Sequence, residues 1–193
     1  MKKVLGQRLR RFPSPEDVMA EVSRILADPA LGGHSLYRVF YYSADPLSGV
    51  AQHPLSGDRV DFAQTSVFSL NSRLIDRIEN QPDVAVRRGT LVHQGWELGR
   101  SAIRAMVSGS KTSVGVEDVV PKIQQKGVDM RIGLDIAALA FKRLVSTIVV
   151  VTGDSDLVPA MKLARREGLR VHLDPLGRRQ VRDELKVHAD RVL

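Results

Sequence analysis

The sequence contains no cysteine among its 193 residues. This absence excludes disulfides, zinc–thiolate sites and a thiol nucleophile, and it fits a reducing, cytoplasmic setting. Any metal must then be held by carboxylates, histidines or phosphate oxygens, and carboxylate sites of that kind favour Mg²⁺ or Mn²⁺.

Long apolar runs are also absent, and the longest apolar stretches are far too short to cross a bilayer. The start of the chain, Met1–Arg11, is basic and lacks the apolar run of a signal peptide. We therefore expect neither membrane insertion nor secretion, and a cytoplasmic protein.

The overall composition is that of an ordinary globular protein, with 43% hydrophobic and 26% charged residues. A chain of this length suits one domain over residues 1–193. The formal net charge is +7, which favours a polyanionic partner such as RNA but equally fits a basic surface with no such role. The sequence leaves a homo-oligomer open.

Helical and strand patterns alternate along the chain, most clearly in its last third. Thr147–Thr152 is a nearly all-apolar strand, as expected in a parallel sheet that is covered on both faces. The pattern predicts an α/β fold with a doubly wound, mainly parallel sheet. The expected helices are 15–26, 60–80, 101–107, 132–144 and 157–167, and the expected strands are 37–44, 84–92, 147–152 and 169–173.

Two acids directly follow the strand Thr147–Thr152, in Gly153-Asp154-Ser155-Asp156. Working groups of a doubly wound sheet gather at the carboxyl ends of its strands, so this position favours a site. The alternative is that Asp156 or Ser155 only caps the next helix. That alternative explains Asp154 less well, because a cap needs one side chain.

A second acidic group lies upstream, where Asp129 opens a helix that also contains Asp135. Six residues of helix place these two side chains about 120° apart, so they need not share a metal. Asp135 is either a supporting acid or a polar residue on the flank of the helix, and Asp129 is alternatively a helix-start acid. Lys122 and Lys126 are candidate phosphate contacts or ordinary solvated lysines.

Carboxylates that lie close together repel each other unless a cation neutralises them. A hydrated Mg²⁺ does so, and can then activate water and stabilise charge on a phosphodiester.

These motifs resemble the NYN domain family, a branch of the PIN-like nucleases that includes bacterial LabA-like proteins. The resemblance is sharpest over residues 120–193 and looser over 12–92. The residues that carry it are Gln125-Lys126-Gly127-Val128-Asp129, Asp135 and Val151-Thr152-Gly153-Asp154-Ser155-Asp156-Leu157-Val158-Pro159-Ala160.

The resemblance implies a PIN-like α/β/α sandwich and cleavage of RNA by a water that Mg²⁺ or Mn²⁺ activates. It implies that Asp129, Asp154 and Asp156 are the metal-site and catalytic acids. Asp135 matches a recurrent acid of the family. Thr152 and Ser155 match positions that hydrogen-bond the acids or a phosphate.

One departure concerns the start of the chain. Such domains begin with an apolar strand that is central to the sheet and ends in an Asp-Gly-x-Asn motif, which supplies another acid. Here residues 2–11 resemble the helix that follows that motif. Either the start codon is misassigned or the chain is a truncated, catalytically weakened member, and the helical character of residues 2–11 favours the first.

The sequence therefore predicts a metal-dependent ribonuclease, weakened if the first-strand acid is missing. The alternative is a non-catalytic RNA-binding or regulatory module with a degenerate site, which would bind RNA in a salt-sensitive way. A third hypothesis is a phosphatase-like or nucleotide-binding α/β protein. Neither a G-x-x-x-x-G-K-[ST] loop nor a G-x-G-x-x-G run supports it.

Overall fold

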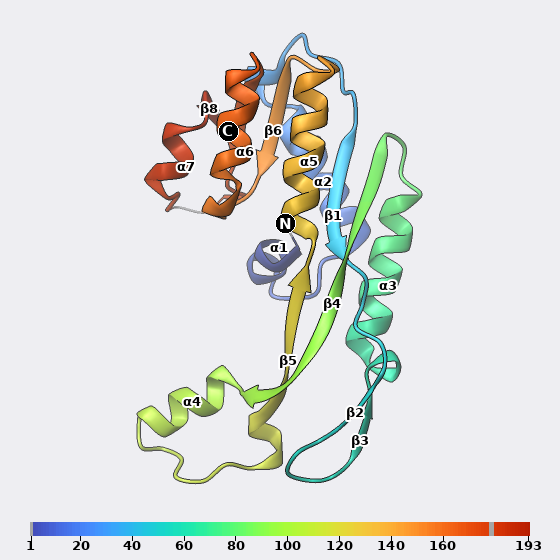
Figure 1. Cartoon of the computed structure of the whole chain (residues 1–193), viewed down its shortest axis with the longest axis vertical. Coiled ribbons are helices and arrows are strands. Elements are labelled where there is room, and N and C mark those ends of the chain that lie inside the picture. The colour runs from blue at the N-terminus through green and yellow to red at the C-terminus, as the bar shows by residue number, and fades with distance from the viewer. Residues whose placement is uncertain (1, 178–179) are drawn as a thin grey trace.

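The computed structural model describes residues 2–177 and 180–193, and within them the side chains of all but residues 2–4 and 7. Helices and strands alternate, and the predicted mixed α/β fold with parallel strand pairs is confirmed (Figure 1). The α-helices are α1 (Lys2–Leu9), α2 (Pro15–Leu26), α3 (Ser66–Glu79), α4 (Arg100–Val107), α5 (Val128–Phe141), α6 (Val158–Arg166) and α7 (Asp183–Val187).

The strands form three separate sheets rather than one continuous sheet. One sheet has the order β1-β4-β5, another β6-β7-β8, and β2 pairs with β3 alone. The pairs β1–β4, β6–β7 and β7–β8 are parallel, whereas β4–β5 and β2–β3 are antiparallel. The strands are β1 (Val39–Ala44), β2 (Val50–Gln52), β3 (Arg59–Asp61), β4 (Val84–Leu98), β5 (Val119–Lys126), β6 (Thr147–Val151), β7 (Arg170–Asp174) and β8 (Arg191–Val192).

Helix α2 begins as the sequence predicts. The Ser14 hydroxyl accepts the N–H of Asp17 while the Asp17 carboxylate accepts the N–H of Ser14, and Pro15 starts the helix. The guanidinium of Arg11 donates two hydrogen bonds to Asp17 and, with the Ser14 N–H, lowers the pKa of that carboxyl to about 2. The direction of α2 is therefore fixed by groups that are close in sequence.

Strand β4 is longer than predicted, and β5 was not expected at all. β4 continues past Val92 to Leu98 and pairs with β5 as a two-stranded arm. Gly95 has a φ of +91°, and the register shifts between His93 and Trp96, so a bulge lets the arm bend. The polar, proline-containing sequence of β5 does not show the pattern of a half-buried strand.

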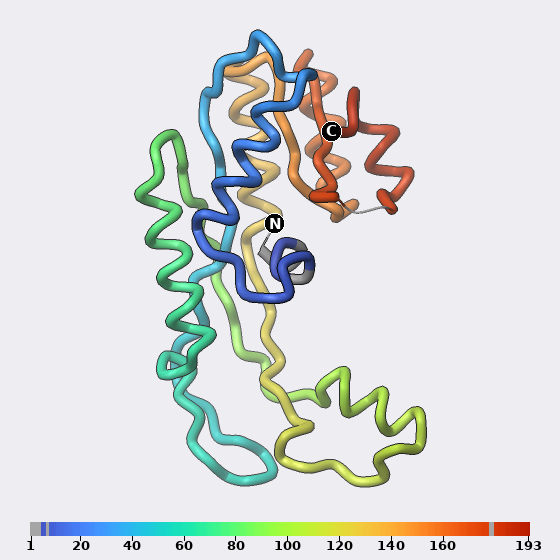
Figure 2. Tube along the Cα trace, turned by 180° about the vertical axis from the view of Figure 1, so that it is seen from behind, coloured from blue at the N-terminus to red at the C-terminus, as the bar shows by residue number. Residues whose placement is uncertain are grey.

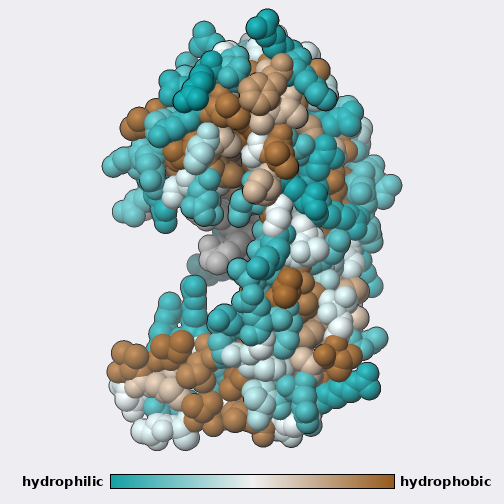
Figure 3. Space-filling model, in the orientation of Figure 1, coloured by the Kyte–Doolittle hydropathy of each residue, from teal (hydrophilic) through white to brown (hydrophobic). Residues whose placement is uncertain are grey.

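The arm reaches away from the rest of the molecule and ends in α4 (Figure 1). Apolar side chains cover this end in the space-filling view (Figure 3). Exposed members on α4 and the loops near it are Ile103, Val107, Val114 and Val116. The arm thus adds a largely solvent-exposed surface to the α/β body.

The main core lies between α5, α6 and the β6–β7 pair. Met161, Val171, Leu173 and Leu185 are all fully buried in it. Alternate residues of β6, Ile148 and Val150, face this cluster, as the two-residue repeat of a strand requires. A second, smaller cluster joins α1, α2, α3 and β1 through Leu5, Val18, Tyr41, Leu74 and Ile78.

Buried His172 on β7 is expected to make stability depend on pH. Burial first, and the charge of Arg191 second, lower the pKa of its imidazole below the ordinary 6.5. The unfolded chain therefore takes up the proton first as the pH falls. We expect the free energy of unfolding to decrease below about pH 6.5, by less than the about 1.4 kcal/mol per pH unit of one full proton.

Urea unfolding between about pH 7.5 and 5 checks this expectation. His172→Gln should flatten the pH dependence in this range, whereas the matched change His188→Gln, at a partly exposed position, should not. An unchanged slope in His172→Gln would contradict the assignment.

Among the described residues, no helix is long and apolar enough to cross a membrane.

Candidate functional site

The turn after β6 holds Asp154 in a defined position. The N–H of Thr152 donates to the carbonyl of Asp174 at 3.1 Å, and the Thr152 hydroxyl accepts the N–H of Asp154 at 3.0 Å. One carboxylate oxygen of Asp154, Oδ1, accepts the N–H of Asp156 at 3.2 Å. Thus Asp154, rather than Ser155 or Asp156, caps the short helical turn Ser155–Leu157. Within the described part of the chain, Oδ2 of Asp154 has no hydrogen bond.

Asp129 lies in the first turn of α5, directly after β5 ends. Gly127, with a φ of +78°, makes the turn from strand to helix. At Gly89 of β4, a Cβ atom would lie 2.5 Å from the carbonyl oxygen of Lys126 and 2.7 Å from Val128. Glycine at this position therefore lets the start of α5 lie close against β4.

Asp129 and Asp154 line the same cavity, which has a volume of about 1600 Å³ and also borders Tyr42, Gln125 and Thr152. We call it the interstrand cavity because β1 and β6 line it along their whole length, together with residues of α2 and α5. One residue from each of the two separated acidic motifs thus borders this cavity. Asp156 is exposed and, like Asp135, does not line this cavity.

Asp135 faces β1 and β4 and already has cationic and neutral partners. Its Oδ2 accepts hydrogen bonds from the Tyr42 hydroxyl and from Nε of Arg87, both at 2.9 Å. Burial and the hydrogen bond to Asp135 both raise the pKa of the Tyr42 phenol. The guanidinium of Arg87 also lies 5.1 Å from the centre of the Phe40 ring. This arrangement ties α5 to the β1–β4 pair.

The remaining predicted residues lie at or close to the surface. The Ser155 hydroxyl accepts a hydrogen bond of 2.6 Å from Arg182. Lys122 and Lys126 are exposed on β5 and form no ion pair with any residue that the structure describes. Both lysines are thus accessible to a dissolved anion, Lys126 being close in sequence to Asp129.

The residues present fit a divalent metal to a limited extent. No group of three or more histidine, aspartate or glutamate side chains is close enough to hold a metal within residues 2–177 and 180–193. Mg²⁺ is nevertheless usually held by only one or two carboxylates, with water and substrate phosphates as its other ligands. Asp129 and Asp154 supply carboxylates of that kind at one cavity.

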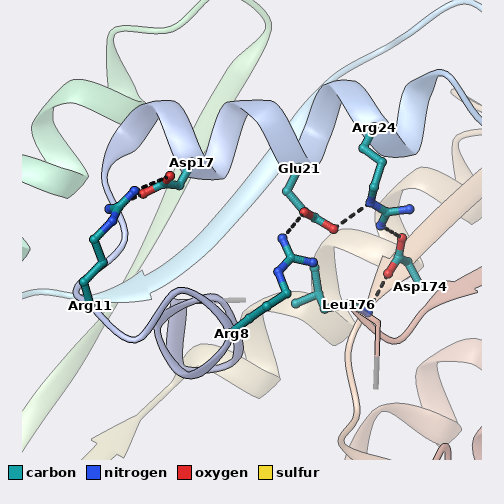
Figure 4. A network of polar contacts seen from close by, with 7 residues as sticks. All are labelled: Arg8, Arg11, Asp17, Glu21, Arg24, Asp174 and Leu176. Carbon is teal, nitrogen blue, oxygen red and sulfur yellow. Dashed lines mark hydrogen bonds and ion pairs between the residues drawn. The ribbon is translucent and has the colours of Figure 1, made fainter. Parts of the chain in front are cut away.

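A polar network beside the β6–β7 edge was not predicted from the sequence (Figure 4). Asp174 ends β7, is 1% exposed, and accepts hydrogen bonds from Arg24 and from the N–H of Leu176. Arg24 also donates to Glu21 at 2.7 Å, and Arg8 donates to the same carboxylate at 2.5 Å. Burial opposes ionisation of Glu21, but these two guanidinium groups outweigh it and lower its pKa.

This network fixes α1 and α2 against the carboxyl end of β7. One feature of the sequence could have indicated Asp174 as a member of this network. Asp174 directly follows the predicted strand 169–173, so it lies at the same end of the sheet as Asp154. Its partner Arg24 lies 150 residues away and could not be identified from local spacing.

Comparisons with known proteins agree with the sharper half of the resemblance. An uncharacterized protein, y4oD of Sinorhizobium fredii, is 44% identical over 50 residues, which are 26% of this chain and 23% of that protein's length. No solved structure matches the chain. The NYN domain model matches residues 58–193 and indicates a nuclease-type, PIN-like function, for which divalent metals are typical. Since this match covers more than half of the residues, the chain belongs to the NYN domain family.

Proposed function

We propose that the chain is a ribonuclease domain that hydrolyses RNA phosphodiester bonds with Mg²⁺ or Mn²⁺, in the cytoplasm. The observation that supports this proposal most is the position of Asp129 and Asp154, from two separate acidic motifs, at one cavity beside the end of β6. Membership of the NYN family makes a nuclease the natural assignment for paired acids at this place.

Each acid of the site has a distinct proposed role. Asp129 and Asp154 would hold the ion, and Oδ2 of Asp154 is free for this among the described residues because Oδ1 caps the following turn. Asp156 is exposed two residues further on and supplies a further carboxylate. Asp135 supports the site from the other side of α5 through its contacts with Tyr42 and Arg87. A divalent ion held there would supply an activated water and stabilise charge on the phosphate.

Exposed cations and hydroxyl groups are proposed to hold the substrate backbone. Lys122 and Lys126 are exposed on β5 and are proposed to contact phosphates next to the cleaved bond. Thr152 and Ser155 are proposed to orient the acids or a phosphate, as their hydrogen bonds with Asp154 and Arg182 suggest. The net charge of +7 favours a polyanion over a small neutral substrate.

The test is cleavage of a labelled single-stranded RNA by the purified chain, with Mn²⁺, with Mg²⁺ and with a chelator. We expect cleavage with a divalent ion and none with the chelator. A phosphomonoester offered under the same conditions should stay intact, because the proposed reaction needs a phosphodiester.

A non-catalytic RNA-binding module is the second candidate, favoured by the small number of acids that share the cavity. It predicts RNA binding that weakens steeply with salt, without metal-dependent turnover. Release of phosphate from the monoester with intact RNA would instead overturn both candidates.

A further inference from the structure

Strands β1 and β6 are the facing edges of two sheets, and neither has a strand partner on that edge among the described residues. Both run in the same direction, with their carboxyl ends at the same end of the body (Figure 1). The interstrand cavity is lined by every residue of β1 and of β6. The two edges thus form opposite walls of one space.

The hydrogen bonds of β1 show which of its backbone groups face this space. The N–H of Val39 donates to Asp83 and that of Asp45 to Gly89, both on the β4 side. Backbone groups alternate between the two edges of a strand, so odd-numbered residues of β1 face β4. The N–H and C=O groups of Phe40, Tyr42 and Ala44 therefore face the cavity.

The same argument applies to β6. The C=O of Ser146 accepts from Arg170, and the N–H of Thr152 donates to Asp174, both on the β7 side. Even-numbered residues of β6 therefore face β7, and the backbone groups of Thr147, Val149 and Val151 face the cavity. Polar backbone groups along both walls call for an occupant that offers donors and acceptors at the same repeat.

The other two walls are helices with apolar side chains. Helix α5 covers one face of the gap and α2 the opposite face, as Figures 1 and 2 show from the two sides. The lining residues are Ile132, Ile136 and Leu139 from α5, and Val22 and Ile25 from α2. The volume of about 1600 Å³ exceeds the roughly 300–1,000 Å³ of an ordinary small-molecule pocket.

We propose that the interstrand cavity accepts one further β-strand, an extended apolar polypeptide segment that lies parallel to β1 and β6. Its backbone pairs with both edges and joins the two sheets into one. Its side chains point alternately to α5 and α2, which requires apolar residues at successive positions. The partner chemistry is thus that of a peptide, because a lipid or an aromatic ligand leaves both rows of backbone groups unpaired.

The proposal concerns binding and does not rest on the proposed nuclease function. If the chain binds the peptide but does not cleave RNA, the strand-binding proposal stands and only the proposed nuclease function fails. The two failures are therefore distinguishable.

The test uses the full chain and a synthetic peptide of β-branched apolar residues, as long as the six residues of β1, with a lysine at each end. Amide hydrogen exchange is measured with and without peptide. We expect the cavity-facing amides of Phe40, Tyr42, Thr147 and Val149 to exchange at least about tenfold more slowly with peptide. The amides of Val39 and Val150, which face β4 and β7, should change little.

Two controls test the backbone pairing. A peptide that is N-methylated at alternate residues cannot donate on one edge and should bind at least about tenfold more weakly. Val149→Pro removes an N–H that faces the cavity and not the β7 ladder, so it should fold and also weaken binding. If this variant does not fold, the weaker binding of the methylated peptide still tests the backbone pairing.

Three results would overturn the proposal. One is no saturable binding of the peptide, and another is protection along β5 or β8 in place of β1 and β6. The third is protection of the cavity-facing amides without peptide in a self-associated form of the chain, because a second copy would then be the occupant.

Discussion

Replacing Asp154 by asparagine is expected to lower metal-dependent RNA cleavage by on the order of 100-fold or more, because the metal loses a charged ligand worth several kcal/mol in the transition state. Asparagine still offers an oxygen to the N–H of Asp156, so the cap of the turn is kept. The fold should therefore survive, and the loss should appear in turnover at saturating Mn²⁺. The measurement is the initial rate of cleavage of a labelled RNA.

The matched control is Asp58→Asn, which removes the same charge from an exposed loop far from the cavity. Cleavage by this variant should stay within about twofold of the parent, since distant exposed charges act weakly in salt. Asp129→Asn should resemble Asp154→Asn. A fully active Asp154→Asn protein would rule out the metal site at this cavity.

Replacing Arg24 by methionine is expected to lower the free energy of unfolding by about 3 kcal/mol, because it leaves the buried Asp174 carboxylate without its cation. Asp174 is only 1% exposed, so water cannot replace the lost partner. Glu21 also loses one of its two guanidinium donors. Urea unfolding of the variant at neutral pH measures the change.

The double variant Arg24→Met, Asp174→Asn provides the control. Removal of both charges should restore much of the loss, since no uncompensated charge then remains in the interior. Arg77→Met, at an exposed guanidinium 3.8 Å from the exposed Glu16, should change stability by less than about 0.5 kcal/mol. Strictly additive effects of the two substitutions would contradict the pairing.

Local patterns in the sequence predicted the elements whose residues interact with near neighbours. The predicted helix 15–26 corresponds to α2, and the predicted strand 147–152 corresponds to β6, which ends one residue earlier, at Val151. The antiparallel arm was missed because β5 is stabilised by pairing with β4 and not by an apolar face. Its burial pattern is mostly exposed, so no periodicity marks it in the sequence.

The candidate site shows the same division. Asp129 and Asp154 were expected at one site because of the family resemblance, since no strand was predicted before Asp129, and both line one cavity. The sequence suggested Ser155 or Asp156 as the helix cap, whereas the structure shows that Asp154 is the capping residue. Spacing alone does not show which side-chain oxygen accepts the backbone N–H. The partners of Asp135 were not predictable, because Tyr42 and Arg87 come from strands 93 and 48 residues away.

The network of Arg24 and Asp174 also sets an order of events during synthesis. Arg24 leaves the ribosome 150 residues before Asp174 does, which corresponds to roughly 8–30 s at about 5–20 residues per second. During that interval Arg24 of α2 has no carboxylate of β7 to pair with. The first helices of the nascent chain therefore take their final place only after almost all of it has emerged.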